Sequence, residues 1–321
     1  MKEIMEQIND PRIAVYDLSD RTQIEVTGRD RATLLHGFCT NDIKRLKAGD
    51  GCEAFLTNIK GRVLGHLFIF AGPDSLWLDT VPGQEAAIIA HLDRYVIRED
   101  VQLIGRTAER GELFITGQFA AQLLMLDDGL APYGSVRRET PGSTIEIRRV
   151  DLLNEPGFLM SVPRQSIELT RASLIAVGCV AGTNEEFETR RIESGFPFYG
   201  QDITDDQIAQ EVARTKQCVS FTKGCYLGQE PIARLDAMGH TNRELRRIRF
   251  EAGSAPHVGA TLLAVDSDEE AGLMTSVAPL TSPTGETAAL AYLKTRFNQA
   301  GTRVRMSEPT GIATVQTVEA N

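Results

Sequence analysis

The residues best suited to chemistry lie in one short segment, Lys-Gly-Cys-Tyr-Leu-Gly-Gln-Glu, at residues 223–230. It places the thiol of Cys225 two positions after the ammonium group of Lys223. A nearby positive charge favours the thiolate, which is the nucleophilic and metal-binding form of cysteine. Gly224 and Gly228 can adopt backbone angles that other residues resist, which predicts a tight, exposed turn. We interpret Cys225 and Lys223 as a candidate functional pair; the alternative is a small buried cysteine.

The other cysteines and the histidines do not predict a resident metal. The chain has five cysteines, and the closest two, Cys218 and Cys225, are seven positions apart. This spacing supports neither a disulfide framework nor a Cys-x-x-Cys knuckle. The five histidines form no HExxH or other paired-ligand pattern. We therefore expect no intrinsic metal and assign no metal ligands.

Composition limits the possible partners. With 321 residues, 42% hydrophobic and 24% charged, the chain is expected to fold into two or three globular domains. No apolar run approaches the ~20 residues that span a bilayer, and residues 1–6 are too polar for a signal peptide, so we expect no membrane contact and a cytoplasmic location. The formal charge of −10 disfavours general nucleic-acid binding. The arginines of residues 243–249 are interpreted as a solvated strand face.

The elements that must position the candidate thiol indicate an α+β fold. Predicted strands alternate irregularly with predicted helices, the strands at 13–16, 23–27, 53–57 and 62–70 and the helices at 83–96 and 164–177. This order favours mixed, largely antiparallel sheets over a doubly wound parallel sheet. The chain carries no Gly-x-Gly-x-x-Gly or Walker-type loop, so a bound nucleotide is not indicated.

The last quarter of the chain has a different pattern. From about residue 243, short apolar runs alternate with turn signals such as the Ser-Pro-Thr-Gly of residues 282–285. Strands of this length and spacing predict a small antiparallel β-barrel. We place the boundary near Gly239, which gives a region at 1–240 and a C-terminal barrel domain at 241–321.

Residues 223–230 also resemble the signature of the YgfZ family, folate-binding proteins that assist the maturation of iron–sulfur enzymes. That family is similar in fold to the T-protein, the aminomethyltransferase of the glycine cleavage system. The resemblance implies that residues 1–240 form an aminomethyltransferase-like folate-binding region of two intertwined α+β subdomains. It implies tetrahydrofolate, or a one-carbon derivative, as cofactor. Iron–sulfur assembly factors or client enzymes would be the protein partners.

A second match to this superfamily lies just upstream. Residues 191–195 and 199–203 are similar to two T-protein motifs, and Glu211 stands where the T-protein has a glutamate that recognises the pterin ring. One carboxylate can accept two adjacent N–H groups of a pterin in a bidentate pair. The resemblance thus implies Glu211, Tyr199 and Arg191 as cofactor-binding residues. Taken alone, Glu211 would be an ordinary surface glutamate.

One departure from the T-protein bears on the reaction. Where the T-protein has an acidic pair that assists aminomethyl transfer, this chain has Gly65 and His66. Glycine has no side chain to accept a proton, and His66 shares strand parity with Leu64 and Phe68, which favours a buried position. We therefore favour a tetrahydrofolate-binding accessory protein for iron–sulfur enzymes, with Cys225 as its key residue. The alternative is a folate-dependent one-carbon transferase or demethylase acting on an unknown substrate.

Overall fold

The computed structural model describes residues 13–126, 129–140, 143–239, 241–308 and 311–317. The N-terminal segment used above to argue against a signal peptide lies outside these ranges, as does residue 240 at the expected domain boundary. Within the ranges, no helix has the length and apolar character needed to cross a membrane.

The chain divides into two compact units, each assembled from separate segments. The first contains the residues before 58, together with 64–183 and 217–227. The second contains 58–63, 184–216 and the residues from 228 onward. The barrel strands are thus grouped with two earlier segments, and the division into 1–240 and 241–321 stays a prediction.

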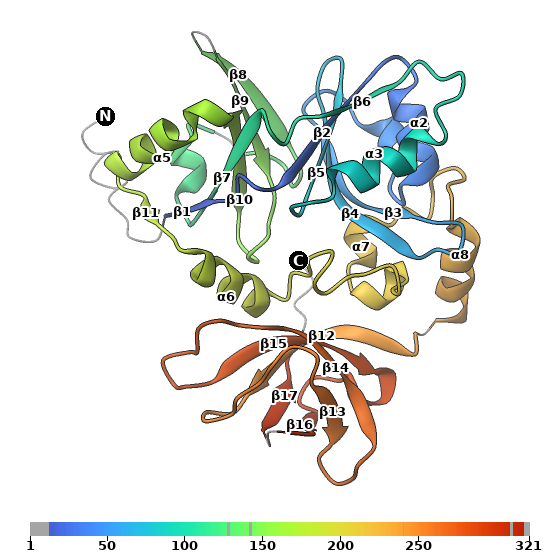
Figure 1. The fold of residues 1–321 in the computed structure, drawn as a ribbon, viewed down its shortest axis with the longest axis vertical. Coiled ribbons are helices and arrows are strands. Elements are labelled where there is room, and N and C mark those ends of the chain that lie inside the picture. The colour runs from blue at the N-terminus through green and yellow to red at the C-terminus, as the bar shows by residue number, and fades with distance from the viewer. Residues whose placement is uncertain (1–12, 127–128, 141–142, 240, 309–310, 318–321) are drawn as a thin grey trace. The chain divides into compact units, whose positions relative to one another are not determined.

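The first unit holds a six-stranded sheet, drawn mainly in green in Figure 1, in the order β11-β1-β7-β10-β9-β8. All its pairings are antiparallel except the parallel pair of β1 and β11. Helices α4 and α5 pack against this sheet over a core that includes Ile115, Phe158 and Leu174. The bounds are β1 Ala14–Asp17, β7 Arg110–Thr116, α4 Ala120–Leu123, β8 Ser135–Thr140, β9 Ser143–Arg149, β10 Gly157–Pro163, η2 Arg164–Ser166, α5 Ile167–Ala176 and β11 Val180–Ala181.

A five-stranded sheet completes the first unit, in the order β3-β4-β5-β2-β6, drawn in blue to blue-green in Figure 1. Its core includes Ile24, Leu56, Ile69 and Leu78. Gly28, in the turn before α2, has φ +93°, and a Cβ there would lie 2.0 Å from the carbonyl oxygen of Asp100, so only glycine fits. The bounds are β2 Thr22–Thr27, α2 Arg31–Phe38, η1 Ile43–Arg45, β3 Gly51–Thr57, β4 Val63–Ala71, β5 Leu76–Thr80, α3 Glu85–Asp93, β6 Gln102–Gly105 and α7 Thr215–Cys218.

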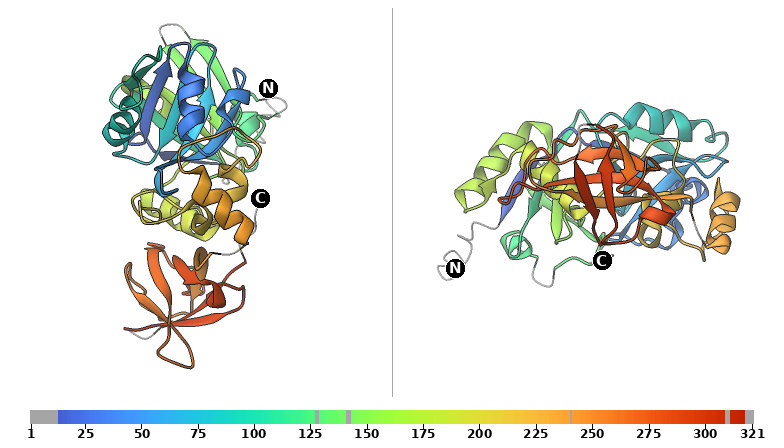
Figure 2. Two further views of the ribbon diagram at one scale, coloured as in Figure 1. Left: turned by 90° about the vertical axis from the view of Figure 1, so that its right-hand side faces the viewer. Right: turned by 90° about the horizontal axis from the view of Figure 1, so that it is seen from below.

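The second unit contains a closed barrel in the order β12-β15-β14-β13-β16-β17, orange to red in Figure 2. Small and medium side chains such as Ala289, Ala291 and Val304 fill its interior. The prediction of an α+β chain with an antiparallel barrel is confirmed. The bounds are α6 Asn184–Ser194, η3 Ala209–Val212, α8 Gln229–Met238, β12 Arg243–Phe250, β13 Thr261–Ala264, β14 Glu270–Val277, β15 Thr287–Lys294, η4 Thr295–Phe297, β16 Arg303–Met306 and β17 Ile312–Val315.

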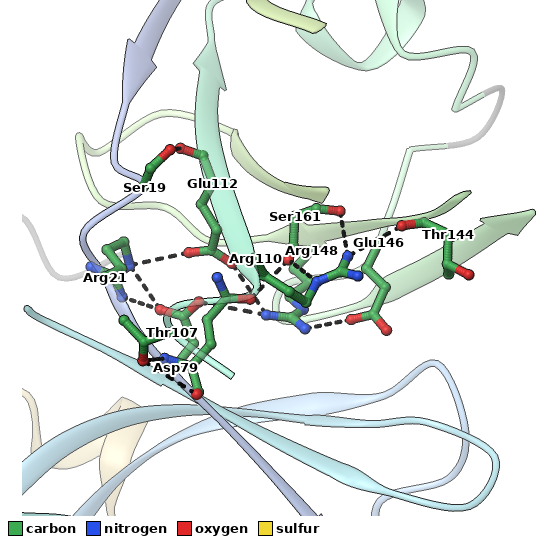
Figure 3. Close-up of polar contacts among 11 residues, drawn as sticks. Ser19, Arg21, Asp79, Thr107, Arg110, Glu112, Thr144, Glu146, Arg148 and Ser161 are labelled. Atoms are coloured by element: carbon green, nitrogen blue, oxygen red, sulfur yellow. Dashed lines mark hydrogen bonds and ion pairs between the residues drawn. The ribbon is translucent and has the colours of Figure 1, made fainter. Parts of the chain in front are cut away.

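Buried charges connect the two sheets of the first unit (Figure 3). Arg21, just before β2, donates to Asp79 Oδ1 on β5, with Nε at 2.7 Å. Arg148 on β9 has no exposed surface and lies 3.2 Å from Glu112 Oε1 on β7 and 3.5 Å from Asp79 Oδ2. The Arg148 guanidinium also pairs with Glu146 and lies over the ring of Trp77.

Within this network, burial raises the pKa of Glu112 well above its ordinary value, and the neighbouring Asp79 carboxylate raises it further. Among the described residues, Glu112 Oε2 and Asp79 Oδ2 receive no hydrogen bond. A proton held between these two carboxyl groups would satisfy both oxygens. We infer that Glu112 is the protonated member of the network.

A second buried arginine organises the other unit. Arg191 on α6 has no exposed surface; its Nη1 donates to Asp202 Oδ2 at 2.8 Å and to the carbonyl of Phe196 at 2.7 Å. Asp202 in turn accepts hydrogen bonds from Thr275 and Ser276 on β14. The ion pair therefore links α6, the loop that follows it and the barrel.

We predict that Asp79→Asn and Glu112→Gln will differ sharply in stability. Asp79→Asn leaves two buried arginines short of a counter-charge and should cost about 3–5 kcal/mol in the free energy of unfolding. Because the pKa of Glu112 is raised in the native state, its stabilising contribution is full below about pH 4.5 and is lost as pH rises through the native pKa. Glu112→Gln should thus gain stability relative to wild type from pH 5 to 8 in urea titrations, and a pH-independent difference would contradict the protonated state.

Arg191→Met should cost about 3–5 kcal/mol in the free energy of unfolding, because Asp202 would be left as an uncompensated buried charge. The matched control is Arg303→Met, which removes a surface pair with Glu251 at 2.7 Å in which both side chains are more than half exposed. Such pairs contribute about 0–1 kcal/mol. Equal losses in chemical denaturation would show that the Arg191 pair does not hold the unit together.

Candidate functional site

The loop that carries Cys225 is fastened to the first unit at both ends. Next to α7, Thr40 Oγ1 donates to the carbonyl of Cys218 at 2.6 Å and the Ser220 amide donates to the carbonyl of Thr40 at 3.0 Å. At the other end, Thr57 Oγ1 donates to the carbonyl of Leu227 at 2.6 Å, and the Leu227 amide donates to the carbonyl of Gly37 at 2.9 Å. Residues 219–228 contain no helix or strand, as predicted, and hydrogen bonds attach both ends of the segment to the first unit.

Of the two glycines in this loop, only Gly228 needs its special backbone freedom. It has φ +86°, and a Cβ there would lie 2.3 Å from the carbonyl oxygen of Asn58. Gly228 is the N-cap residue of α8, so it ends the loop and starts the helix. Pro231 lies in the first turn of that helix, where the missing backbone N–H of proline is tolerated.

Lys223 points into the unit rather than into solvent. Its Nζ donates to the carbonyl oxygens of His36 at 2.5 Å and Cys39 at 2.6 Å, at the C-terminal end of α2, and lies over the ring of Tyr226. Carbonyl oxygens at a helix C-terminus attract a cation. Burial lowers the pKa of Lys223 to about 8. In the described part of the chain no hydrogen bond joins Lys223 to Cys225, and the pairing of their functional groups stays a prediction.

Cys225 differs from the other cysteines in its exposure. It is exposed, whereas Cys39, Cys52, Cys179 and Cys218 are buried. Burial raises the pKa of Cys39 to about 12 and that of Cys179 to about 11, and it also raises the pKa of Cys52. These three thiols are therefore protonated at neutral pH, and Cys225 is the thiol that a reagent or partner reaches first.

Glu211 lies on η3 of the second unit and is almost buried. Arg243 on β12 donates to both of its carboxylate oxygens, Nε to Oε1 at 3.1 Å and Nη2 to Oε2 at 3.3 Å. The Ile208 amide also donates to Oε2, at 3.4 Å. Each carboxylate oxygen has two acceptor positions, so the capacity left for a ligand is on Oε1. Glu211 is thus an almost buried carboxylate whose orientation is fixed by the Arg243 guanidinium, and not a surface glutamate.

Tyr199 lies in the loop at 196–203, and Arg191 on α6 pairs with Asp202 of the same loop. The Phe198 amide donates to Asp202 Oδ2 at 3.0 Å, so the Arg191–Asp202 pair sets the loop conformation. Tyr199 is half-buried, and burial raises the pKa of its hydroxyl, with Asp205 adding to the effect. Because Arg191 is fully buried, its contribution to any ligand site is to position the loop.

The predicted residues thus fall into two groups, Lys223 and Cys225 in the first unit and Arg191, Tyr199 and Glu211 in the second. Among the described residues no hydrogen bond joins Tyr199 to Glu211. Sequence reasoning missed Arg243 as the partner of Glu211, because the arginines of β12 had been interpreted as a solvated face. In the structure the Arg243 side chain is 37% exposed and still pairs with Glu211, and Arg247 donates to the carbonyls of Glu193 and Thr317.

Curated relatives of this chain include proteins with two kinds of name. A chloroplastic transferase of Arabidopsis thaliana, At1g60990, is 27% identical over 93% of this chain and 69% of its own length. An aminomethyltransferase of Herpetosiphon aurantiacus is 26% identical over 90% of this chain and 81% of its own length. The mitochondrial iron–sulfur cluster assembly factor IBA57 homolog of Aspergillus fumigatus is 27% identical over 78% of this chain and 60% of its own length.

Among solved structures, the glycine cleavage system aminomethyltransferase T of Bartonella henselae superposes with a TM-score of 0.84. The match covers 98% of this chain and 88% of that protein, at 19% sequence identity. The likeness confirms the expected aminomethyltransferase-like fold with its terminal barrel. A family model described as the GCVT N-terminal domain matches residues 8–223, which is well over half of the sequence, and the chain therefore belongs to that family.

Proposed function

We propose that this protein binds tetrahydrofolate, or a one-carbon derivative of it, and serves the assembly or maintenance of iron–sulfur enzymes as a member of the YgfZ group. The observation that carries the proposal is the exposed Cys225, presented on a loop tied down at both ends. A thiol on a rigid, accessible loop can meet a protein partner or a cluster without a prior rearrangement. The relative named as an iron–sulfur cluster assembly factor supports the same assignment.

The folate part of the proposal rests on Glu211. Arg243 fixes both of its oxygens, and Oε1 retains an acceptor position for an N–H group at the edge of a pterin. The Tyr199 loop, held by Arg191 and Asp202, would supply the neighbouring contacts. The location in the cell is proposed to be the cytoplasm.

A second candidate function, one-carbon transfer, is favoured by a different observation. Several relatives are named aminomethyltransferases. The acidic pair missing at Gly65 and His66 has a partial substitute, because Glu53 on the adjacent strand lies 2.6 Å from His66 Nε2. A carboxylate is therefore available beside position 66, although both side chains are buried. The transferase needs the folate but not the Cys225 thiol, and this difference separates the two functions.

Glu211→Gln should weaken tetrahydrofolate binding about tenfold to a hundredfold, because one acceptor oxygen becomes an amide donor that mismatches a ligand N–H. Isothermal calorimetry gives the two dissociation constants. Glu244→Gln is the matched control, since Glu244, like Glu211, pairs with an arginine of β12, in this case Arg246 at 2.7 Å. If both variants bind folate like wild type, Glu211 is not in the site.

Cys225 should be alkylated before the four buried cysteines in time-resolved mass spectrometry, because it is the exposed thiol. Cys225→Ser should fold and bind folate like wild type, yet fail to restore iron–sulfur enzyme activity in cells lacking the native protein. Cys179→Ser, a change at a buried thiol, is the control and should restore it. Full restoration by Cys225→Ser would reject the accessory function and favour the transferase.

A further inference from the structure

Three side chains with different metal-binding atoms meet inside the first unit. Glu53 lies on β3, His66 on the adjacent strand β4, and Cys218 is the last residue of α7. His66 Nε2 is 2.6 Å from Glu53 Oε1, Cys218 Sγ is 3.2 Å from the same oxygen, and Sγ is 3.8 Å from Nε2. All three are buried, with exposures of 0% for Glu53 and Cys218 and 6% for His66.

The arrangement does not match a thiol activated by a histidine relay. In such a relay the thiol contacts one ring nitrogen and the carboxylate orients the ring through the other nitrogen. Here the sulfur and the carboxylate oxygen both face Nε2. The sulfur is also buried, whereas a catalytic thiol has to reach its substrate. Three ligand atoms that converge on one point are instead the arrangement of a metal site.

We propose that Glu53, His66 and Cys218 bind a divalent transition metal, with Zn²⁺ as the expected ion. Tetrahedral zinc, with bonds of about 2.3 Å to sulfur and about 2.0 Å to nitrogen and oxygen, holds its ligand atoms roughly 3.3–3.6 Å apart. The separations of 3.2 and 3.8 Å lie close to either end of this range, and the separation of 2.6 Å between Nε2 and Oε1 has to lengthen most.

Charge and donor type favour the same class of ion. A carboxylate and a thiolate together carry two negative charges, so a divalent cation makes the buried set neutral. The thiolate selects zinc or a similar transition metal over Mg²⁺ and Ca²⁺, which prefer oxygen ligands. Three protein ligands leave the fourth position to a water or substrate group.

The surroundings also provide the support that metal ligands require. The hydroxyl of Tyr133 donates to the second Glu53 oxygen, Oε2, at 2.7 Å and so orients Oε1 toward His66 and Cys218. Hydrogen bonds of this kind fix metal-binding carboxylates and affect affinity. The ring of His66 packs at 5.2 Å from that of Phe55, which limits its rotation.

This inference departs from the expectation of no resident metal, which was drawn from sequence spacing. Glu53 and His66 are 13 positions apart, and Cys218 is 152 positions beyond His66. No short motif joins them, and they meet only because β3, β4 and α7 fold together. The inference is independent of folate binding and of Cys225.

The test uses the full-length protein and Co²⁺ as a spectroscopic probe. Because the ligands are buried, the metal is loaded by refolding in the presence of Zn²⁺ or Co²⁺, and binding should weaken as pH falls because the thiol must lose its proton. We expect about one Zn²⁺ per chain by elemental analysis. The Co²⁺ protein should show visible d–d bands and a sulfur-to-cobalt charge-transfer band.

Cys218→Ser should abolish the charge-transfer band and lower Co²⁺ affinity at least a hundredfold, whereas the control Cys179→Ser should keep both. Tyr133→Phe should retain the band and lower affinity about tenfold, as loss of a supporting hydrogen bond does. Circular dichroism checks folding, and Glu53→Gln replaces Cys218→Ser should that variant unfold. A wild-type protein without stoichiometric metal or cobalt–thiolate band overturns the proposal, as does a band that survives in Cys218→Ser.

Discussion

Burial of charge between two sheets is the constraint on which the first unit depends. Arg21 and Arg148 would each be costly without a counter-charge, which Asp79 supplies from the five-stranded sheet, while the protonated Glu112 joins the network from the other sheet. Because such pairs tolerate little error in geometry, they fix the two sheets in one arrangement more strictly than apolar contacts would. The loop of Cys225 and the cluster around Glu53 are both mounted on β3 of the five-stranded sheet, so their geometry follows from that arrangement.

The two proposed functional features of this unit are the Cys225 thiol and the cluster of Glu53, His66 and Cys218. They differ in their exposure to solvent. Cys225 is exposed, whereas Cys218, seven positions earlier, is buried beside a histidine and a carboxylate. One short segment of chain thus places one thiol at the surface and another in the interior. Lys223 lies between them and holds the segment against the end of α2, so its charge stabilises the loop's position.

Sequence patterns predicted the α+β class, the barrel and the exposed position of Cys225, because these follow from local periodicity and turn chemistry. They could not predict the partners of Lys223 and Glu211, which lie far away in sequence. One signal was available: Glu53 is a charged residue at the head of the apolar stretch Ala54, Phe55 and Leu56, and a buried acid requires a partner. The identity of that partner depends on the fold alone.

The second unit is assembled from three segments that are far apart in the sequence, and this affects the order in which the protein can fold during synthesis. Its turn at 58–63 pairs with residues near 207, as in the hydrogen bond from the Val63 amide to the carbonyl of Gln207 at 2.9 Å, and the unit also needs the barrel strands that run to Val315. During synthesis the turn leaves the ribosome long before its partners exist. The first unit likewise waits for residues 217–227. Both units are therefore completed late in translation, and neither corresponds to a continuous piece of the gene.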